Sequence, residues 1–194
     1  MTRTQYYTAT SIDGFIADAD NSLSWLFEVE GDPDERAGSW DAFIGAVGAM
    51  AMGATTYQWI LDHERLLERP EQWQAMYADR PSWVFTHRDL PAIPGADIRF
   101  CRGDVRPMHA EMAEAAAGHN VWVIGGGDLV GQFDDAGLLD EIRLAVMPVF
   151  LGAGAPLLPR RITSERLALR SMDRNGPQVS LVYDVAPRPG AGAD

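Results

Sequence analysis

Hydrophobic and polar positions along this chain follow two different periods, which is typical of a protein that mixes strands with helices. Runs rich in β-branched and aromatic residues predict strands, and amphipathic stretches that follow a capping residue predict helices. The predicted strands before residue 140 are TQYYTAT (4–10), AMAMG (49–53), PSWVFTHRDLP (81–91, ending in a turn), ADIRFC (96–101) and VWVI (121–124). The predicted helices are WDAFIGAVG (40–48, capped by Ser39), TTYQWILDHERLL (55–67, capped by a threonine), RPMHAEMAEAAAGHN (106–120) and DLVGQF (128–133). This alternation favours a parallel sheet with helices packed on it.

The pattern changes after residue 140. The strands EIRLAVMPVFLG (141–152), RLALRSMD (166–173) and QVSLVYDV (178–185) follow one another without an intervening helix, which predicts antiparallel pairing. We therefore expect an α/β fold with a mixed, mostly parallel central sheet, antiparallel strands at its C-terminal end and helices on both faces. The 194 residues suit a single domain, which we place at residues 1–186, with residues 187–194 as a disordered tail.

Charge and composition exclude several function classes. The formal net charge of -12 would repel a nucleic-acid backbone, and no basic stripe offsets it. The sequence has no run of about 18 apolar residues and no apolar N-terminal core, so we expect a cytoplasmic protein without a membrane or nucleic-acid partner. All 16 basic residues are arginine, and the absence of lysine excludes a Schiff-base lysine, a pyridoxal phosphate enzyme and a P-loop.

Metal and thiol sites are disfavoured as well. Cys101 is the single cysteine, which excludes a disulfide within the chain and a multi-cysteine zinc site. The segment HAE at 109–111 matches half of the zinc deaminase signature, but the P-C-x-x-C half is missing. We interpret this segment as helix surface and expect no bound metal. A serine hydrolase is disfavoured because no G-x-S-x-G segment occurs.

Three consecutive glycines, Gly125 to Gly127, connect a predicted strand directly to a predicted helix. Glycine leaves the amide N–H groups uncovered, and the positive end of the following helix points at whatever lies on them. At the carboxyl edge of a parallel sheet, such a turn is typical of a nucleotide site. A tight turn without a ligand is the alternative. The dinucleotide fingerprint of an ordinary Rossmann domain is not met, because its third glycine position is Val130.

Six segments together resemble the dihydrofolate reductase fold. In order, they are TATSIDGFIA, the tryptophan at 25, AMGATTYQWI, WVFTHR, VWVIGGGDLVGQF and LLDEIRLAVMPVFLGAGAPLLP. The opening S-x-D-G, the M-G-x-x-T-Y and the P-V-x-x-G-x-G segments look most like the C-terminal reductase domain of the bifunctional riboflavin deaminase-reductases and its stand-alone bacterial relatives. The resemblance runs from residue 5 to about 184. It implies a three-layer fold, hydride transfer from NADPH, and a cis or distorted peptide bond between Gly125 and Gly126.

The resemblance also implies which residues bind the cofactor. The diphosphate would lie on the glycine turn, the adenosine 2′-phosphate at residues 86–88, and the nicotinamide beside the first strand. The implied cofactor-binding residues are Ala9, Thr10, Ile16, Gly53, Thr55, Thr56, Thr86, His87, Arg88, Ile124, Gly125, Gly126, Gly127, Asp128 and Leu129. Residue types alone leave alternatives open, because Thr55 and Thr56 can simply cap a helix and Arg88 can be a solvated surface arginine. In that last case, NADH would serve almost as well as NADPH.

A long polar loop, residues 11–38, is implied to hold the substrate. The candidate catalytic residues in it are Asp13, Trp25 and Glu28, with the proton arriving through ordered water. The implied substrate is a small heterocycle of the pterin or ribosylaminopyrimidine type. Asp13 can equally form only a tight turn, and Trp25 can equally anchor the loop to the core.

The sequence departs from dihydrofolate reductases at three places. The acidic residues after Trp25, which include Glu28, do not stand in the W-x-L-P-x-D frame that binds a pterin. Ala54 and Asp128 occupy positions at which those enzymes have a basic residue. We therefore expect Asp128 to point away from the cofactor and to cap its own helix.

Two further expectations concern activity and assembly. The alternative to a reductase is a module that binds a nicotinamide nucleotide without reducing a substrate, as a sensor or assembly partner. The apolar runs RLAVMPVFLG and SLVYDV are longer than a small antiparallel edge needs. Relatives without the deaminase half form twofold dimers through this region, so a homodimer is expected.

Overall fold

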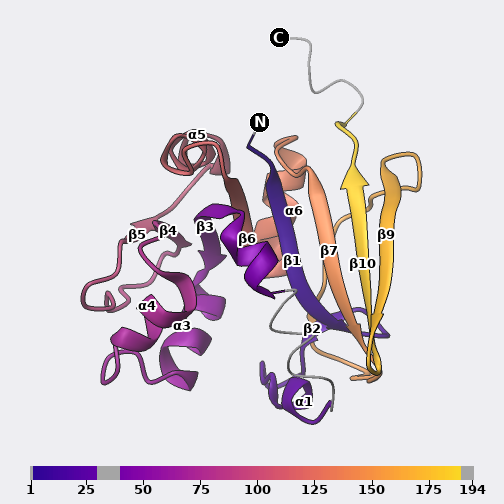
Figure 1. The fold of residues 1–194 in the computed structure, drawn as a ribbon, viewed down its shortest axis with the longest axis horizontal. Coiled ribbons are helices and arrows are strands. Elements are labelled where there is room, and N and C mark those ends of the chain that lie inside the picture. Colours follow the sequence, from indigo (N-terminus) through magenta and orange to yellow (C-terminus); the bar gives the residue numbers. More distant parts are fainter. Residues whose placement is uncertain (1, 30–39, 189–194) are drawn as a thin grey trace.

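The computed structural model of the protein describes residues 2–29 and 40–188. Eight strands form one sheet in the order β5-β4-β3-β6-β1-β7-β10-β9, and β2 pairs with β8 in a separate two-stranded sheet (Figure 1). The strands are β1 (Thr4–Ser11), β2 (Phe15–Ala17), β3 (Val47–Gly53), β4 (Ser82–Phe85), β5 (Ile98–Cys101), β6 (Asn120–Gly125), β7 (Glu141–Met147), β8 (Ala155–Pro156), β9 (Leu167–Asn175) and β10 (Gln178–Val185). The helices are α1 (Ser24–Phe27), α3 (Ala54–His63), α4 (Glu71–Tyr77), α5 (Val105–Ala115) and α6 (Gly127–Asp135), and residues 40–45 are also helical.

The direction of the strands divides the sheet in two. From β5 across to β7, neighbouring strands are parallel. β10 then runs antiparallel to β7, and β9 antiparallel to β10. The predicted α/β fold, with a mostly parallel sheet and antiparallel C-terminal strands, is confirmed.

Helices cover both faces of the sheet and bury a separate core on each. On one face, α5 and α6 pack on small and β-branched residues such as Ala49, Ala51 and Val123. On the other face, α3, α4 and the helix at 40–45 pack on larger residues such as Met50 and Trp122. The alternation in AMAMG explains this division, because successive side chains of a strand point to opposite faces. The result is a three-layer arrangement, in which α6 lies behind the sheet in Figure 1.

Several element boundaries differ from the sequence prediction. α3 begins at Ala54 with Gly53 at its N-cap, so neither threonine caps it. α5 ends at Ala115, because Ala117 and Gly118 adopt positive φ, and residue 120 already belongs to β6. β7 ends at Met147, before a proline that has no N–H to donate to a sheet.

Four short elements, α1, α4, β2 and β8, were not predicted. α4 follows Pro70 without a side-chain cap, and β2 and β8 are very short and lie far apart in the sequence. Residues 30–38 of the predicted long loop and the predicted cap Ser39 lie outside the described residues. The same holds for residues 189–194 of the predicted tail, whereas Arg188 is described and pairs with Asp134.

The fold brings the predicted site segments to one edge of the sheet. β1 runs from the top of Figure 1 down to the turn before β2, so the carboxyl ends of the parallel strands lie at the lower edge. α1, α3 and β2 all lie at this edge. Among the described residues, no helix is both long enough and apolar enough to cross a membrane.

Candidate functional site

The glycine turn joins β6 to α6 at the carboxyl edge of the sheet. Gly125 ends β6 with φ 151°, Gly126 is the N-cap of α6, and the peptide bond between them is cis, as the resemblance implied. No side chain caps this helix. The first N–H groups of a helix have no partner within it, so those of α6 are available to a ligand.

Gly126 and Gly127 lack side chains for different reasons. Among the described residues, a Cβ atom on Gly126 would meet only Ile16 Cδ1, at 4.0 Å. A Cβ atom on Gly127 would lie 2.5 Å from the carbonyl oxygens of both Pro156 and Leu157. Packing against the chain at β8 therefore requires Gly127, whereas Gly126 leaves an open space that a ligand can fill.

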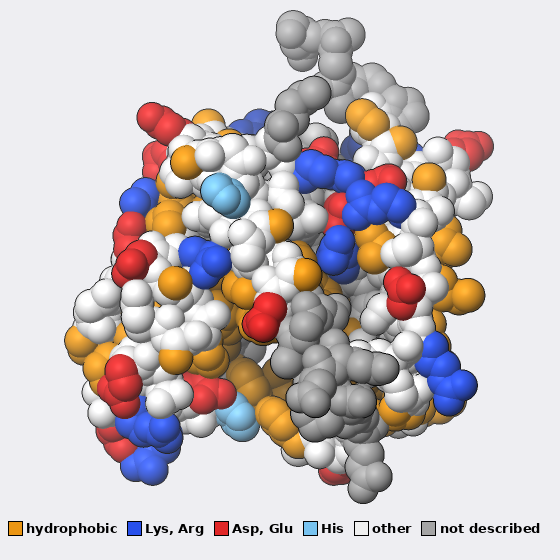
Figure 2. Space-filling view, in the orientation of Figure 1, with side chains coloured by type: hydrophobic (Ala, Val, Ile, Leu, Met, Phe, Trp, Pro, Cys, Tyr) orange, Lys and Arg blue, Asp and Glu red, His pale blue; other side chains and the backbone are white. Residues whose placement is uncertain are grey.

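This space belongs to a cavity of about 590 Å³ at the carboxyl edge. Figure 2 shows a hollow between the part that carries α3 and α4 and the part that carries α1, with hydrophobic side chains inside it. The residues predicted to bind the cofactor that line the cavity are Ile16, Gly53, Thr55, Thr56, Ile124, Gly125, Gly126, Gly127, Asp128 and Leu129. The cavity is large enough to hold an extended ligand.

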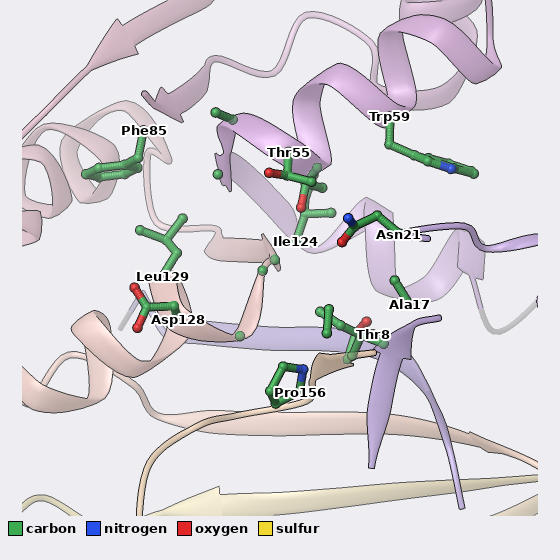
Figure 3. A pocket seen from close by; sticks show the side chains of 18 of the residues that line it. Thr8, Ala17, Asn21, Thr55, Trp59, Phe85, Ile124, Asp128, Leu129 and Pro156 are labelled. Atoms are coloured by element: carbon green, nitrogen blue, oxygen red, sulfur yellow. The ribbon is translucent and has the colours of Figure 1, made fainter. Parts of the chain in front are cut away.

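The two ends of the cavity differ in character. Asp128, Leu129 and Phe85 lie toward one end, and Trp59, Asn21, Thr8 and Ala17 lie toward the other (Figure 3). Residues of the first turns of both α3 and α6 line the cavity. Two helix N-termini on one cavity attract an anion, because each carries a partial positive charge and free N–H groups.

Asp128 does not cap α6, so that prediction is wrong. Because it lies after Gly127, its side chain is already inside the first turn. Its carboxylate is bound by two other side chains. Its Oδ1 atom lies 3.1 Å from the guanidinium of Arg160, and its Oδ2 atom accepts a hydrogen bond of 3.1 Å from Gln132.

Ala9 and Thr10 of β1 lie away from the cavity lining. Ala9 packs against the cluster of Trp25, Ala145 and Met147. Thr10 is buried, and its hydroxyl donates to the carbonyl oxygen of Phe15 at 3.1 Å. Thr8 lines the cavity in their place.

A second, smaller pocket of about 140 Å³ lies at the ends of β4 and β5. Thr86 and Arg88 line it, whereas His87 is exposed and lines neither pocket. The hydroxyl of Thr86 accepts a hydrogen bond of 2.9 Å from the backbone N–H of Arg88, which fixes the turn. Arg102 also lines this pocket, and the sequence prediction missed it.

The predicted catalytic residues do not line the cavity. The carboxylate of Asp13 accepts hydrogen bonds from Ser11 Oγ (2.6 Å), Leu151 N (3.1 Å) and Gly152 N (2.7 Å). These bonds, chiefly the one from Ser11, hold the pKa of Asp13 below its usual value. Asp13 therefore ties the turn after β1 to the chain that follows β7.

Trp25 lies within α1, and Glu28 is the C-cap residue that follows it. Trp25 is only 4 % exposed and packs against Ala145 and Met147. This packing favours the alternative role given above, in which Trp25 anchors the loop to the core. Its indole N–H has no hydrogen-bond partner within the described chain. Glu28 is exposed at the C-terminal end of α1.

Helix spacing identifies cavity residues that sequence reasoning missed. Trp59 follows Thr55, and Gln132 follows Asp128, each by four residues on the same helix face. The ring of Trp59 stacks on His63 at a centroid distance of 4.4 Å, and His63 in turn stacks on Phe27 of α1 at 5.2 Å. Asn21 comes from the loop after β2 and could not be found by spacing. Among the described residues, no group of His, Cys, Asp and Glu could hold a metal ion.

The sheet order, the glycine turn and the cavity at the carboxyl edge define a dihydrofolate reductase-like α/β fold. A putative riboflavin biosynthesis protein from Shewanella sp. PV-4 has the same fold, with a TM-score of 0.73 and 21% identity over 95% of this chain and 99% of its own. Dihydrofolate reductase from Enterococcus faecalis, complexed with NADP(H) and RAB-propyl, superimposes with a TM-score of 0.63 and 12% identity, over 94% of this chain and 96% of its own.

Sequence similarity defines the family. The RibD C-terminal domain family matches residues 4–181, so the chain belongs to this family. The uncharacterized protein YwjB of Bacillus subtilis (strain 168) is 30% identical over 181 residues, which cover 93% of this chain and 97% of YwjB.

Proposed function

We propose that this protein is an NADPH-dependent reductase that transfers a hydride to a carbon–nitrogen or carbonyl double bond of a small heterocycle. The observation that carries the proposal is the convergence of the glycine turn and the N-termini of α3 and α6 on one cavity. Membership of the RibD C-terminal domain family and the likeness to a dihydrofolate reductase in complex with NADP(H) support it.

The residues at the glycine turn fit the diphosphate of a dinucleotide. The open space at Gly126 gives phosphate oxygens access to the first N–H groups of α6. Thr55 and Thr56, in the first turn of α3, provide hydroxyl and amide donors from the other side of the cavity. The smaller pocket at Arg88 and Arg102 would take the 2′-phosphate, because arginine donates two parallel hydrogen bonds to such a group.

The other end of the cavity suits the reacting rings. Thr8 and Ile124 provide a surface on which a nicotinamide ring can lie, and Trp59 and Asn21 remain for the substrate. Ile16, which lines the cavity beside Gly126, would lie between this ring and the diphosphate. When bound, NADPH supplies the hydride. The protein's own residues orient the two rings and exclude water from between them.

Among the described residues, no carboxylic acid or histidine lines this end of the cavity to donate the proton. In the described part of the chain, Asp128 is the only charged residue that lines the cavity, and it belongs to the diphosphate end. Asn21 is a neutral amide that can hydrogen-bond a ring carbonyl or N–H group but cannot protonate it. We therefore assign proton delivery to water held at this end of the cavity. Membership of the RibD C-terminal domain family favours a substrate of the pterin or ribosylaminopyrimidine type.

NADPH oxidation separates reduction from binding alone. We expect the purified protein to bind NADPH in a calorimetric titration. We also expect it to oxidise NADPH with at least one member of a panel of dihydropterins, pterins and aminopyrimidines that includes 5-amino-6-(5-phosphoribosylamino)uracil. Binding without oxidation across the panel would favour the alternative, a sensor or assembly partner. No binding at all would contradict both functions.

A further inference from the structure

Asp128 places a negative charge where the proposed function requires a diphosphate. It lies in the first turn of α6 and lines the cavity beside the glycine turn. A free carboxylate there would repel phosphate oxygens, and it would compete with them for the N–H groups at the start of α6. The site therefore needs a feature that keeps this carboxylate neutralised and turned away.

Arg160 provides that feature. Its guanidinium lies 3.1 Å from Asp128 Oδ1 and 2.8 Å from Asp135 Oδ2, so it spans two turns of α6. The other oxygen of Asp128 accepts the hydrogen bond from Gln132. Both oxygens of the carboxylate are thus held, one by Gln132 at the cavity and the other by Arg160 outside the lining.

Gly131 makes room for this arrangement. A Cβ atom at Gly131 would lie 2.8 Å from both Cγ and Cζ of Arg160, so the arginine lies directly across the helix at this glycine. The Arg160 side chain is only 26% exposed. Its place is defined by one glycine and two carboxylates, whereas its neighbour Arg161 is exposed and makes no side-chain ion pair within the described chain.

We infer that Arg160 is a positioning residue that makes the glycine turn able to accept a diphosphate, by holding and neutralising Asp128. This inference rests on the proposed function. Arg160 acts through Asp128 and not by touching the ligand, because Pro159 and Asp128 line the cavity but Arg160 does not. Arg160 thus supplies a positive charge next to the glycine turn, where the sequence has Asp128 in place of a basic residue.

A double-mutant cycle tests this role, with NADPH titrated by calorimetry into each variant. We expect Arg160→Met to weaken NADPH binding about tenfold or more, because it leaves Asp128 unpaired beside the diphosphate. Asp128→Asn alone should tighten binding. The double variant Asp128→Asn/Arg160→Met should bind at least as tightly as the wild type, because no carboxylate remains to be neutralised. Arg161→Met removes the same charge one residue away and should leave the affinity unchanged.

Two results would overturn the inference while the proposed function stands. If wild-type protein binds NADPH and Arg160→Met binds equally well, the pair has no role in binding. If the double variant stays as weak as Arg160→Met, Arg160 contacts the ligand directly. Absence of NADPH binding to the wild type would instead overturn the proposed function, and this inference with it.

Gly131→Ala tests the same role of Arg160 without changing any charged residue. The added methyl group displaces the Arg160 side chain, which can move because it is flexible. We expect weaker NADPH binding, and recovery when Asp128→Asn is added. Thermal melting of each variant shows whether it is folded. A folded Gly131→Ala with wild-type affinity would contradict the inference.

Discussion

At the scale of single residues, cofactor choice depends on Arg88. It lines the smaller pocket and is exposed, and its side chain makes no ion pair with another described residue. We expect Arg88→Ala to weaken NADPH binding by roughly ten- to a hundredfold, or about 1.5–3 kcal/mol for one charge-assisted contact, with little effect on NADH. Salt should reduce the preference of the wild type for NADPH.

Calorimetric titration of both cofactors checks this prediction. Arg69→Ala is a matched control, because Arg69 is exposed and does not line either pocket. Equal losses for NADPH and NADH would show that Arg88 supports its turn and does not recognise the 2′-phosphate. The proposed cofactor would then be a nicotinamide nucleotide of either kind.

Asp134 makes the free energy of unfolding depend on pH. It is fully buried in α6 and pairs with Arg166 and Arg188, each at 2.6 Å. Burial alone would raise the pKa of this carboxyl, but the hydrogen bonds from the two arginines outweigh it and lower the pKa. The ionised form therefore stabilises the fold above the unfolded-state pKa of about 3.9, and this contribution is lost as the pH falls through the lower folded-state pKa.

We expect Asp134→Asn to lower the free energy of unfolding by about 3–5 kcal/mol at neutral pH, because two arginines lose their buried partner. The difference from the wild type should shrink once the pH falls below about 4. Urea unfolding of both proteins across this pH range measures it. A difference that stays constant with pH would mean that the charge of Asp134 is not what stabilises the fold.

At the scale of elements, the connections at the carboxyl edge depend on Asp13. Its carboxylate receives the backbone N–H groups of Leu151 and Gly152, and so joins the β1–β2 turn to the chain after β7. We expect Asp13→Ala to speed amide hydrogen exchange at these two residues, because their N–H groups lose the acceptor that holds them. Unchanged exchange there would show that other contacts hold this connection.

Local patterns predicted the elements whose signals are strong and continuous. The run VWVIGGGDLVGQF predicted both β6 and α6, because a strand, a glycine turn and an amphipathic helix follow one another directly. β2 and β8 could not be predicted, since they are very short and depend on pairing between residues far apart in the sequence. α4 escaped because it has no capping side chain.

The candidate site shows the same limit. The residues of the glycine turn and of the first turn of α3 were predicted to bind one cofactor, and they line the same cavity. Asn21 and Arg160 were missed, because each reaches the site from a loop whose course only the tertiary structure defines. Thr8 was missed because the resemblance pointed to its neighbours in β1. Ala9 faces the other side of the strand, and Thr10 is buried with its hydroxyl bonded to Phe15.

At the scale of the whole molecule, the expected dimer interface needs one change. The run RLAVMPVFLG begins in β7, which lies inside the sheet between β1 and β10 and is not an edge. We therefore propose the hairpin of β9 and β10, which contains SLVYDV, as the dimer interface. β9 is an edge strand of the sheet, and its Leu169 and Met172 are 55% and 67% exposed. They pair with Tyr183 and Leu181 of β10, so apolar side chains continue across the hairpin. Such an exposed apolar edge is costly unless another surface covers it.

We expect light scattering at micromolar concentration to give twice the chain mass of 21.3 kDa. The double variant Leu169→Asp/Met172→Asp should be monomeric, because it places charges in the interface. Leu67→Asp changes an equally exposed leucine outside the sheet and should remain dimeric. A monomeric wild-type protein would contradict the assembly.

The proposed function depends on the cavity at the glycine turn, and Gly126→Val tests most directly whether NADPH binds there. Gly126 has ordinary extended backbone angles and open space around its missing side chain, so valine should fold there but occupy the position of the diphosphate. Gly45→Val makes the same change at another uncrowded glycine outside the cavity. In calorimetric titrations with NADPH, we predict binding to the wild type and to Gly45→Val, and none to a Gly126→Val variant that melts like the wild type. Unchanged NADPH affinity in folded Gly126→Val would contradict the account.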